Sequence, residues 1–312
     1  MKEAVGKVER VEHSKNIKKG IKNRVGEFLI ENLIFVLGIT SVLIIALIFM
    51  FLLRTGLRVF LDVSPKEFFL GKYWFPVSKN PQYGILPIVA GSLMVTLGAI
   101  LISVPIGVGS AIFISEVAPP KTKTALKVII EFLSAIPSVV LGFLGIVVLS
   151  NWVRISFSLT SGFTVLTGSI LVSLMAMPTI ISISDDAIRS LPEEYKEASL
   201  ALGATKWETI RYVLIPAASS GIIAAVMLGI GRAIGETMTV MMVTGNAAQI
   251  PNSFLVSGRT MTATIAAEMG DTVRGGTHYH ALFAVGIVLL SMTTVINLIA
   301  DFVLSRAKRE AR

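Results

Sequence analysis

Six long segments of this chain contain either no charged residue or only one or two. A helix that crosses a membrane needs about 20 consecutive, mostly apolar residues, because the hydrocarbon layer is about 30 Å thick. Only 15% of the 312 residues are charged, and most of these lie between the apolar segments. The pattern therefore predicts an all-α membrane protein. Its six transmembrane helices are expected at about 32–53, 85–115, 126–152, 161–184, 217–243 and 280–304.

Six crossings place both ends of the chain on the same side of the membrane. With the termini inside, nineteen Lys and Arg residues fall in inner segments and eight in outer ones, which favours cytoplasmic termini. Five of those eight lie in the first outer loop, which argues against this orientation. We interpret 1–29 as a basic cytoplasmic tail, 30–304 as the transmembrane domain and 305–312 as a cytoplasmic C-terminal tail. The first apolar segment is too long for a signal-peptide core and is expected to be retained.

Several functions are excluded by what the sequence lacks. The chain has no cysteine, which rules out disulfides, cysteine-ligated zinc and thiol catalysis. It has no Walker A sequence, so any ATP must be bound by another subunit. His278 and His280 lie two residues apart, but His13 is expected across the membrane, so neither a metal site nor a catalytic site is expected. The net charge of +8 is explained by basic inner loops and implies no nucleic acid.

Prolines and turn residues mark irregular places in the membrane domain. Pro105 and Pro137 each remove a backbone donor, so each is expected to kink or break its helix. Such kinks suit either a pathway that opens and closes or plain packing, and both interpretations stay open. In the outer segment 245–280, the stretch RTMTATIAAEM has helical spacing. It predicts either a helix packed on the bundle or a segment that dips into the membrane.

The loop 185–216 is too hydrophilic to cross the membrane. Two Ser/Thr-x-x-Glu sequences, at 190–193 and 205–208, match the capping box that begins a helix. Gly203 lies between them, where a helix end in a left-handed conformation favours glycine. We expect a short helix, a glycine turn and a second short helix, with Pro216 opening the next span. On spacing alone, the pair is either a docking element or an ordinary loop.

A longer motif runs through the same loop. It reads Glu197-Ala198-Ser199, three residues, Gly203, nine residues, then Val213-Leu214-Ile215-Pro216. This resembles the EAA loop of bacterial ABC importer permeases, EAA-x3-G-x9-I-x-L-P, with mild departures at three positions. The resemblance implies a MetI-like permease fold in which residues from about Ala198 to Trp207 form a coupling helix that seats in a separate ATPase subunit. The residues implied for this contact are Glu197, Ala198, Gly203, Ala204, Thr205 and Trp207.

Arg232 and Glu236 are the only charged residues of the fifth apolar segment. Arg232 is expected roughly 22 Å along the helix from Ala217, at 1.5 Å per residue, and therefore deep in the membrane. A charge there is unfavourable by roughly 2.5–3.5 kcal/mol even on a lenient scale, so it should face a polar interior with a partner, for which Glu236 at i+4 is the candidate. The pair either fixes helix packing or lines a path for an oxyanion. Arginine binds oxyanions bidentately, and Glu236 accepts a proton from hydrogen phosphate but repels sulfate.

The surrounding sequence GRAIGETMTVMMVTGNA, together with PSVVLGFLG, RTMTATIAAEMG and HYHALFAVG, resembles the phosphate ABC importer permeases of the PstC type over about residues 30–304. The resemblance implies that Arg232, Glu236 and Thr237 line a phosphate path. It also implies a bacterial inner-membrane location and no cofactor in this chain. The implied partners are a PstA-type permease subunit, two copies of a PstB-type ATPase that bind the ATP, a PstS-type phosphate-binding protein and the lipid bilayer.

Two other functions remain open at this point. One is an ABC permease for another oxyanion, such as molybdate or sulfate. The other is a proton-coupled secondary transporter in which Glu236 relays the proton.

Overall fold

The computed structural model describes residues 30–310, without the side chains of 303–304 and 306–310. In this part of the chain, six helices are long and apolar enough to cross a membrane, so the predicted number is confirmed. The basic tail expected at 1–29 and residues 311–312 lie outside the described residues. Residues 305–310, expected as tail, continue the last helix. The six candidate spans are Ile30–Leu61, Leu86–Val117, Ser138–Ser156, Val165–Arg189, Lys206–Gly235 and Thr277–Phe302.

The chain divides after Arg54 into two units, and each is described by itself. The first contains most of the first apolar helix, which starts at residue 30. The second unit, Thr55–Arg312, holds the other five spans and all the features discussed below.

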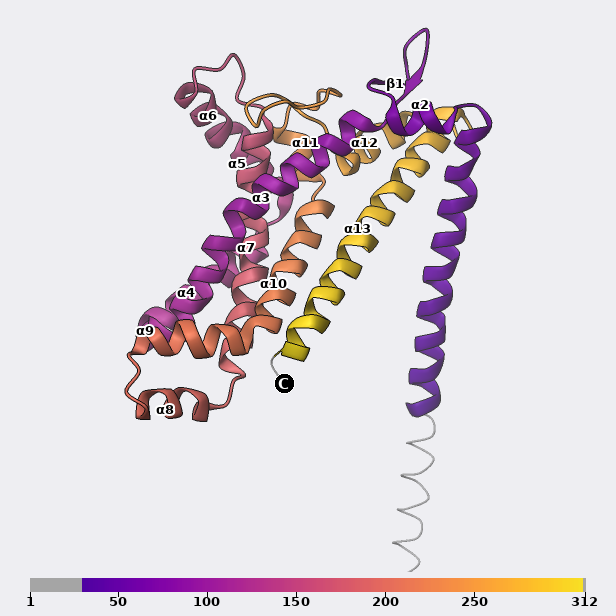
Figure 1. Ribbon diagram of the computed structural model, residues 1–312. Coiled ribbons are helices and arrows are strands. Elements are labelled where there is room, and N and C mark those ends of the chain that lie inside the picture. The colour runs from indigo at the N-terminus through magenta and orange to yellow at the C-terminus, as the bar shows by residue number, and fades with distance from the viewer. Residues whose placement is uncertain (1–29, 311–312) are drawn as a thin grey trace, which may run out of the picture. The chain divides into compact units, whose positions relative to one another are not determined.

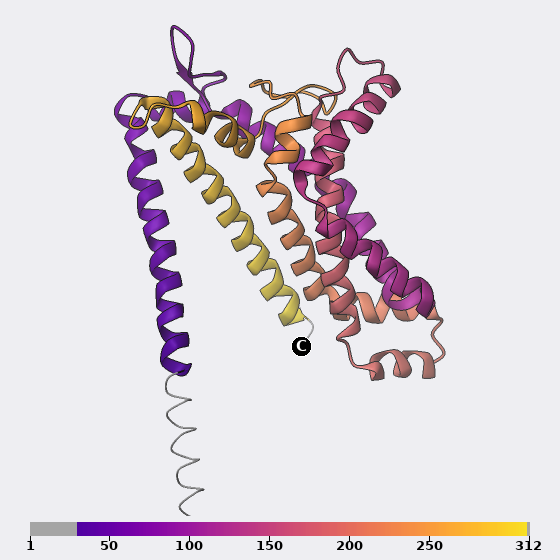
Figure 2. The same ribbon diagram turned by 180° about the vertical axis from the view of Figure 1, so that it is seen from behind.

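Helix α7 (Val165–Arg189) is the central helix of the second unit. It packs along both α3 (Leu86–Ile112) and α10 (Ile215–Gly235), as Figures 1 and 2 show. Small residues permit the close approach, because membrane helices associate through backbone proximity and polar contacts. Ser169 Oγ donates a hydrogen bond to the Val95 carbonyl of α3 at 3.2 Å. Helix α13 (Thr277–Glu310) packs on α10.

The segment expected as one helix at 126–152 is divided, so this expectation was wrong. Helix α4 (Pro120–Ala135) ends at Ile136, which is extended, and α5 (Ser138–Leu144) begins after Pro137. Proline disfavours helical backbone in the residue before it, which explains the break. The chain continues through η3 (Gly145–Leu149) to α6 (Ser150–Ser156). Pro105, in contrast, lies inside the unbroken α3.

One end of the second unit carries a short β-hairpin, and we call it the hairpin end (Figure 1, top). The strands β1 (Trp74–Phe75) and β2 (Gln82–Tyr83) pair antiparallel. They pack with the beginning of α13 in a buried apolar cluster that includes Phe68, Trp74, Ile88 and Leu282. The smaller elements at this end are η1 (Leu57–Leu61), α2 (Pro65–Leu70), α12 (Met261–Glu268) and η5 (Met269–Asp271). Helix α12 packs on α3 and α13, which confirms the helix predicted in RTMTATIAAEM.

The opposite end carries the hydrophilic loop, and we call it the α8 end. Helix α7 continues to Arg189, and α8 spans Glu193–Ala201. The predicted capping box at 190–193 was wrong, because Pro192 takes the N-cap position of α8 and Ser190 ends α7 instead.

The second short helix also differs from expectation. Helix α9 (Lys206–Thr209) runs through the π-helical η4 (Ile210–Leu214) directly into α10, so Pro216 does not open a separate span. Pro216 has no backbone N–H, but it lies in the first turn of α10, directly after the π-helical η4, whose wider turn accommodates the proline ring.

Two glycines of α10 provide a matched test of the packing. A Cβ added at Gly229 would lie 2.6 Å from the Ile180 side chain of α7, whereas one added at Gly231 meets nothing within 4 Å. Overpacking costs about 1–3 kcal/mol, so Gly229→Ala should lower the midpoint of thermal unfolding of the chain in detergent. Gly231→Ala should leave that midpoint unchanged or raise it, because alanine favours helix. Equal midpoints for the two variants would contradict the α7–α10 contact.

Candidate translocation path and coupling loop

The helix expected over 217–243 is broken at the acidic residue of the predicted charge pair. Helix α10 ends at Gly235, Glu236 has extended backbone with ψ 127°, and α11 spans Met238–Val243. Arg232 and Glu236 are therefore not an i,i+4 pair on one helix. Of the ion pairs among residues 30–310, none includes either residue.

The broken backbone is satisfied by three nearby threonines. Thr237 Oγ1 donates to the Gly235 carbonyl at 3.1 Å, and Thr262 Oγ1, from α12, donates to the Glu236 carbonyl at 2.9 Å. The Glu236 carboxylate accepts from the Thr239 backbone N–H at 3.0 Å and so caps the beginning of α11. Unwound backbone at membrane depth is tolerated only where protein or water satisfies it. Thr262 is thus a functional residue that the sequence analysis missed, because its partner lies 26 positions away.

Arg232 lies near the end of α10 and is exposed in this chain. Its Nη1 donates to Thr179 Oγ1 of α7 at 3.3 Å, a long bond that leaves most of the five guanidinium N–H groups unused. The neighbouring Gly231 and Gly235 also face open space, whereas Gly221 and Gly229 face α7. An arginine deep in the membrane cannot face lipid without a large cost. We therefore expect this face of α10 to meet another subunit or a water-filled path.

The coupling loop confirms two local predictions. Gly203 has φ +86°, the left-handed conformation expected of it. The capping box of α9 is complete: Thr205 N–H donates to Glu208 Oε2 at 2.7 Å, and Glu208 N–H donates to Thr205 Oγ1 at 3.3 Å. The stretch from Ala198 to Trp207 is not a single helix, however, because it contains the end of α8, a turn and the beginning of α9.

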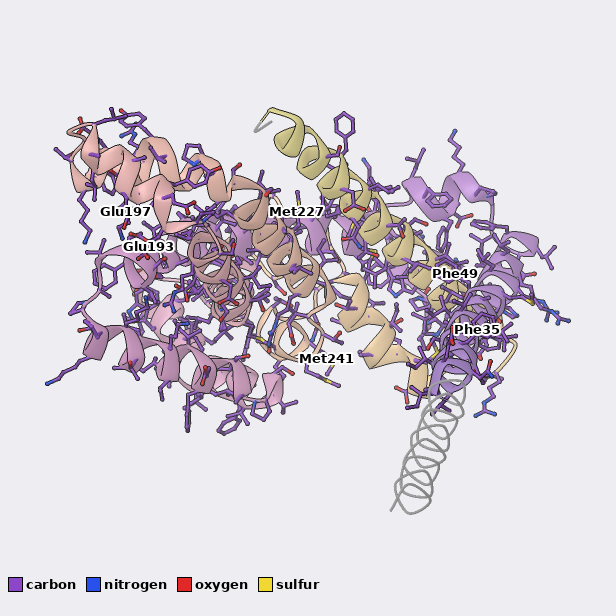
Figure 3. The ribbon with its side chains drawn as sticks, turned by 90° about the horizontal axis from the view of Figure 1, so that it is seen from below. Phe35, Phe49, Glu193, Glu197, Met227 and Met241 are labelled. Atoms are coloured by element: carbon purple, nitrogen blue, oxygen red, sulfur yellow. The ribbon has the colours of Figure 1, made fainter. Side chains whose placement is uncertain are left out.

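Apolar side chains project from this loop. Leu202 is 90% exposed and Trp207 is 60% exposed, and Tyr195 and Leu200 are also exposed. Exposed apolar patches mark sites of protein contact. Figure 3 shows Glu193 and Glu197 of α8 close together at the edge of the second unit. Of the six predicted coupling residues, all are exposed except Ala204, which is half-buried. The sequence analysis missed Leu202, although an apolar residue in a charged loop was a visible signal.

A second polar network lies at the hairpin end, and its centre is Glu268 of α12. The Glu268 carboxylate accepts from Trp74 Nε1 at 3.0 Å and contacts His278 Nε2 at 2.9 Å. Arg259 Nη1 donates to the same carboxylate at 2.5 Å. These residues line a groove of about 710 Å³ beside the hairpin. Burial, and secondarily the negative charge of Asp62, raises the pKa of the nearby Tyr83 phenol.

The histidines of this end form no metal site. His278 pairs with Glu268, and the imidazole of His280 is buried with its Nδ1 unpaired. Among residues 30–310, no group of three His, Cys, Asp or Glu residues could hold a metal ion.

Six spans with an EAA-type loop between the fourth and fifth define a membrane subunit of an ABC importer, and solved structures share this fold. The bacterial ABC transporter that imports alginate aligns over 91% of this chain and 99% of its own, with a TM-score of 0.61 and 17% identity. The inward-facing MetNI methionine ABC transporter aligns over 72% and 94%, with a TM-score of 0.54 and 19% identity.

Sequence comparison gives the family. Residues 103–309 match the model of the binding-protein-dependent transport system inner membrane components, and the chain belongs to that family. It is 44% identical to the probable ABC transporter permease protein YqgH of Bacillus subtilis over 81% of this chain and 82% of that protein. It is 33% identical to the phosphate transport system permease protein PstC of Haemophilus influenzae over 78% and 82%. The resemblance to the PstC type is therefore confirmed.

Substitutions at Gly203 can test whether the turn needs left-handed backbone at this position or only a small side chain. A Cβ there meets nothing within 4 Å, but the positive φ strains any branched residue. Left-handed backbone costs about 1–2 kcal/mol for most residues and less for asparagine. Gly203→Val should reduce the ATPase subunit that co-purifies with the chain, and Gly203→Asn should retain it. Equal loss in both variants would mean that side-chain bulk, and not the backbone, matters.

The Glu268 network should hold the hairpin rigid. In Glu268→Leu, Trp74, Arg259 and His278 lose their common partner, so trypsin should cleave several times faster at the exposed Lys72 and Lys79. Asp271→Leu is the matched control, because Asp271 lines the same groove but is exposed and lies outside the network. Similar cleavage rates in both variants would argue against this role of Glu268.

Proposed function

We propose that this chain is the PstC-type permease subunit of an ATP-driven importer of inorganic phosphate. The observation that carries the proposal is the helix break at Glu236, which leaves the Glu236 carboxylate just beyond the end of α10, the helix that bears the exposed guanidinium of Arg232. The names of relatives such as PstC of Haemophilus influenzae support phosphate as the cargo. The chain itself carries out no covalent chemistry and moves its cargo by alternating access.

The donors and acceptors near the break suit an oxyanion that still carries a proton. The unused N–H groups of Arg232 bind two oxygens of the ion. Glu236 uses one carboxylate oxygen to cap α11 and keeps the other as an acceptor. Hydrogen phosphate donates a hydrogen bond to that acceptor, whereas sulfate has no proton with which to form one and is repelled. Thr237 adds a hydroxyl oxygen at the same place.

The exposed surfaces suit the partners of such an importer. The open face of α10 around Gly231 suits a PstA-type subunit, with the path between the two chains. The apolar patch around Leu202 and Trp207 suits a PstB-type ATPase, of which two copies would bind the ATP. The hairpin end then faces outward, toward a PstS-type phosphate-binding protein. Both termini lie in the cytoplasm in this arrangement, in agreement with the excess of basic residues in the inner segments.

A continuous helix connects the ATPase contact to Arg232. Helix α9 runs through η4 into α10 without a break, so a displacement of α9 by the ATPase reaches Arg232 along one rigid element. The non-helical residues at Glu236 then let α10 move while α11 stays packed against α5 through Thr239, whose Oγ1 donates to the Ser138 carbonyl at 2.9 Å.

Uptake of labelled phosphate into vesicles that contain the whole complex tests the cargo and the path. Arg232→Ala should reduce uptake roughly 10- to 100-fold, since hydrogen bonds to a charged group contribute about 1.5–3 kcal/mol. Glu236→Gln should admit sulfate. Arg154→Ala is the control, because Arg154 lies on α6 and its guanidinium donates to Asn151 of the same helix.

Three outcomes would count against the proposal. Uptake that is unaffected by Arg232→Ala would show that the phosphate path does not depend on Arg232. Transport of sulfate or molybdate in place of phosphate by the unaltered complex identifies another oxyanion permease. Uptake driven by a proton gradient without any ATPase identifies a secondary transporter.

A further inference from the structure

An ion pair ties α8 to a different membrane helix from the one that follows it in sequence. Lys196 Nζ of α8 lies 2.7 Å from Glu116 Oε2. Glu116 belongs to η2 (Phe113–Val117), the π-helical continuation of α3. The Glu116 side chain is only 11% exposed and that of Lys196 is 38% exposed. The carboxylate is thus largely removed from water, with Lys196 as its ionic partner.

Side-chain bonds from α8 to other elements, within the described residues, follow two routes. In one, Ser199 and Thr209 share a hydrogen bond of 2.9 Å, which joins α8 to α9 and hence to α10. In the other, Lys196 reaches Glu116 and hence α3. The first route leads to the helix that bears Arg232. The second leads to α3, which packs along α7 as α10 does.

The surroundings of η2 include a cavity and a second ion pair. A cavity of about 180 Å³ lies beside Ile114 of η2, between α4 and α7. Lys127 of α4 and Asp185 of α7 also line it, and they are paired at 3.0 Å. Arg189 holds the other oxygen of Asp185 at 2.8 Å. Helices α4 and α7 are therefore joined by an ion pair. The segment η2 packs on α7 through apolar side chains such as the buried Ile114, and it is joined to α8 by the Lys196–Glu116 pair.

We propose that Lys196 and Glu116 are positioning residues that carry the displacement of α8 to α3, so that α3 and α10 move together when the ATPase closes. This inference rests on the proposed function. The pair is suited to the task because it is short and its Glu116 carboxylate is largely buried. A carboxylate left without an opposite charge in a desolvated site is unfavourable, so Lys196 should stay with Glu116 when either helix moves. The motif residue Glu197, the next position, is exposed and free for the partner.

The test measures transport and ATP hydrolysis separately in vesicles containing the full complex and the binding protein. Lys196→Glu and Glu116→Lys should each lower the phosphate moved per ATP hydrolysed at least fivefold. The exchanged variant, carrying both substitutions, should recover at least half of the original ratio, because the attraction is restored with reversed polarity. Lys121→Glu is the control, since it makes the same charge change at an exposed position of α4.

Each outcome decides the matter. A purely structural pair would lower the amount of complex, or both activities equally, and leave the ratio unchanged. A ratio within twofold of the original in both single variants, or no recovery in the exchanged variant, overturns the inference. If the unaltered complex moves sulfate and not phosphate, the proposed cargo fails and the same ratio is measured with sulfate.

A second measurement does not depend on tolerance of a reversed charge. The chain has no cysteine, so a variant with Glu116→Cys and Lys196→Cys contributes only these two thiols. A short reagent with two maleimide groups should join the two thiols. Before joining, the phosphate moved per ATP hydrolysed should be lowered, because the ion pair is gone. Joining should raise this ratio again, because it links α8 to η2. The inference is overturned if the thiols fail to join, if the unjoined variant keeps a ratio within twofold of the original, or if joining does not raise the ratio. A pair at 121 and 196 is the control for random collision.

Discussion

The membrane requires that every backbone group of an interrupted helix find a partner, and the structure around Glu236 depends on that requirement. Two hydroxyls and one backbone N–H meet it, and one of the hydroxyls, that of Thr262, comes from α12. Without α12 in this place, the Glu236 carbonyl would be left unpaired at membrane depth. The helix of the 245–280 segment therefore directly supports the backbone at the break.

This bond links the break to the hairpin end. Helix α12 begins near Thr262, whose hydroxyl reaches Glu236, and ends at Glu268, which holds Trp74 of the hairpin. Its eight residues form one short rigid element. A protein that shifts the hairpin can thus act on the backbone next to the predicted charge site through two side-chain contacts and one helix.

The sequence predicted what depends on local chemistry. Uncharged runs predicted the number of spans correctly. The capping box at 205–208 and the left-handed turn at Gly203 formed as expected, because each needs only neighbouring residues. The break at Glu236 was missed because apolar residues continue past it and its stabilising Thr262 is distant in sequence. The Glu268 network was missed for the same reason, since it joins residues 74, 259 and 278. The roles of Arg232 and of the coupling residues remain predictions.

Glu236 also marks where influences from the two ends meet. From the α8 end, helix α9–η4–α10 carries motion up to Gly235. From the hairpin end, α12 holds the carbonyl of the next residue. A continuous helix through this point would transmit every movement of one end directly to the other. Because residues 236 and 237 are not helical, their dihedral angles can absorb the difference, so Arg232 can follow the α8 end while Glu236 stays with the hairpin end. In the proposed importer, separation and approach of these two charges is the change that the two ends together control.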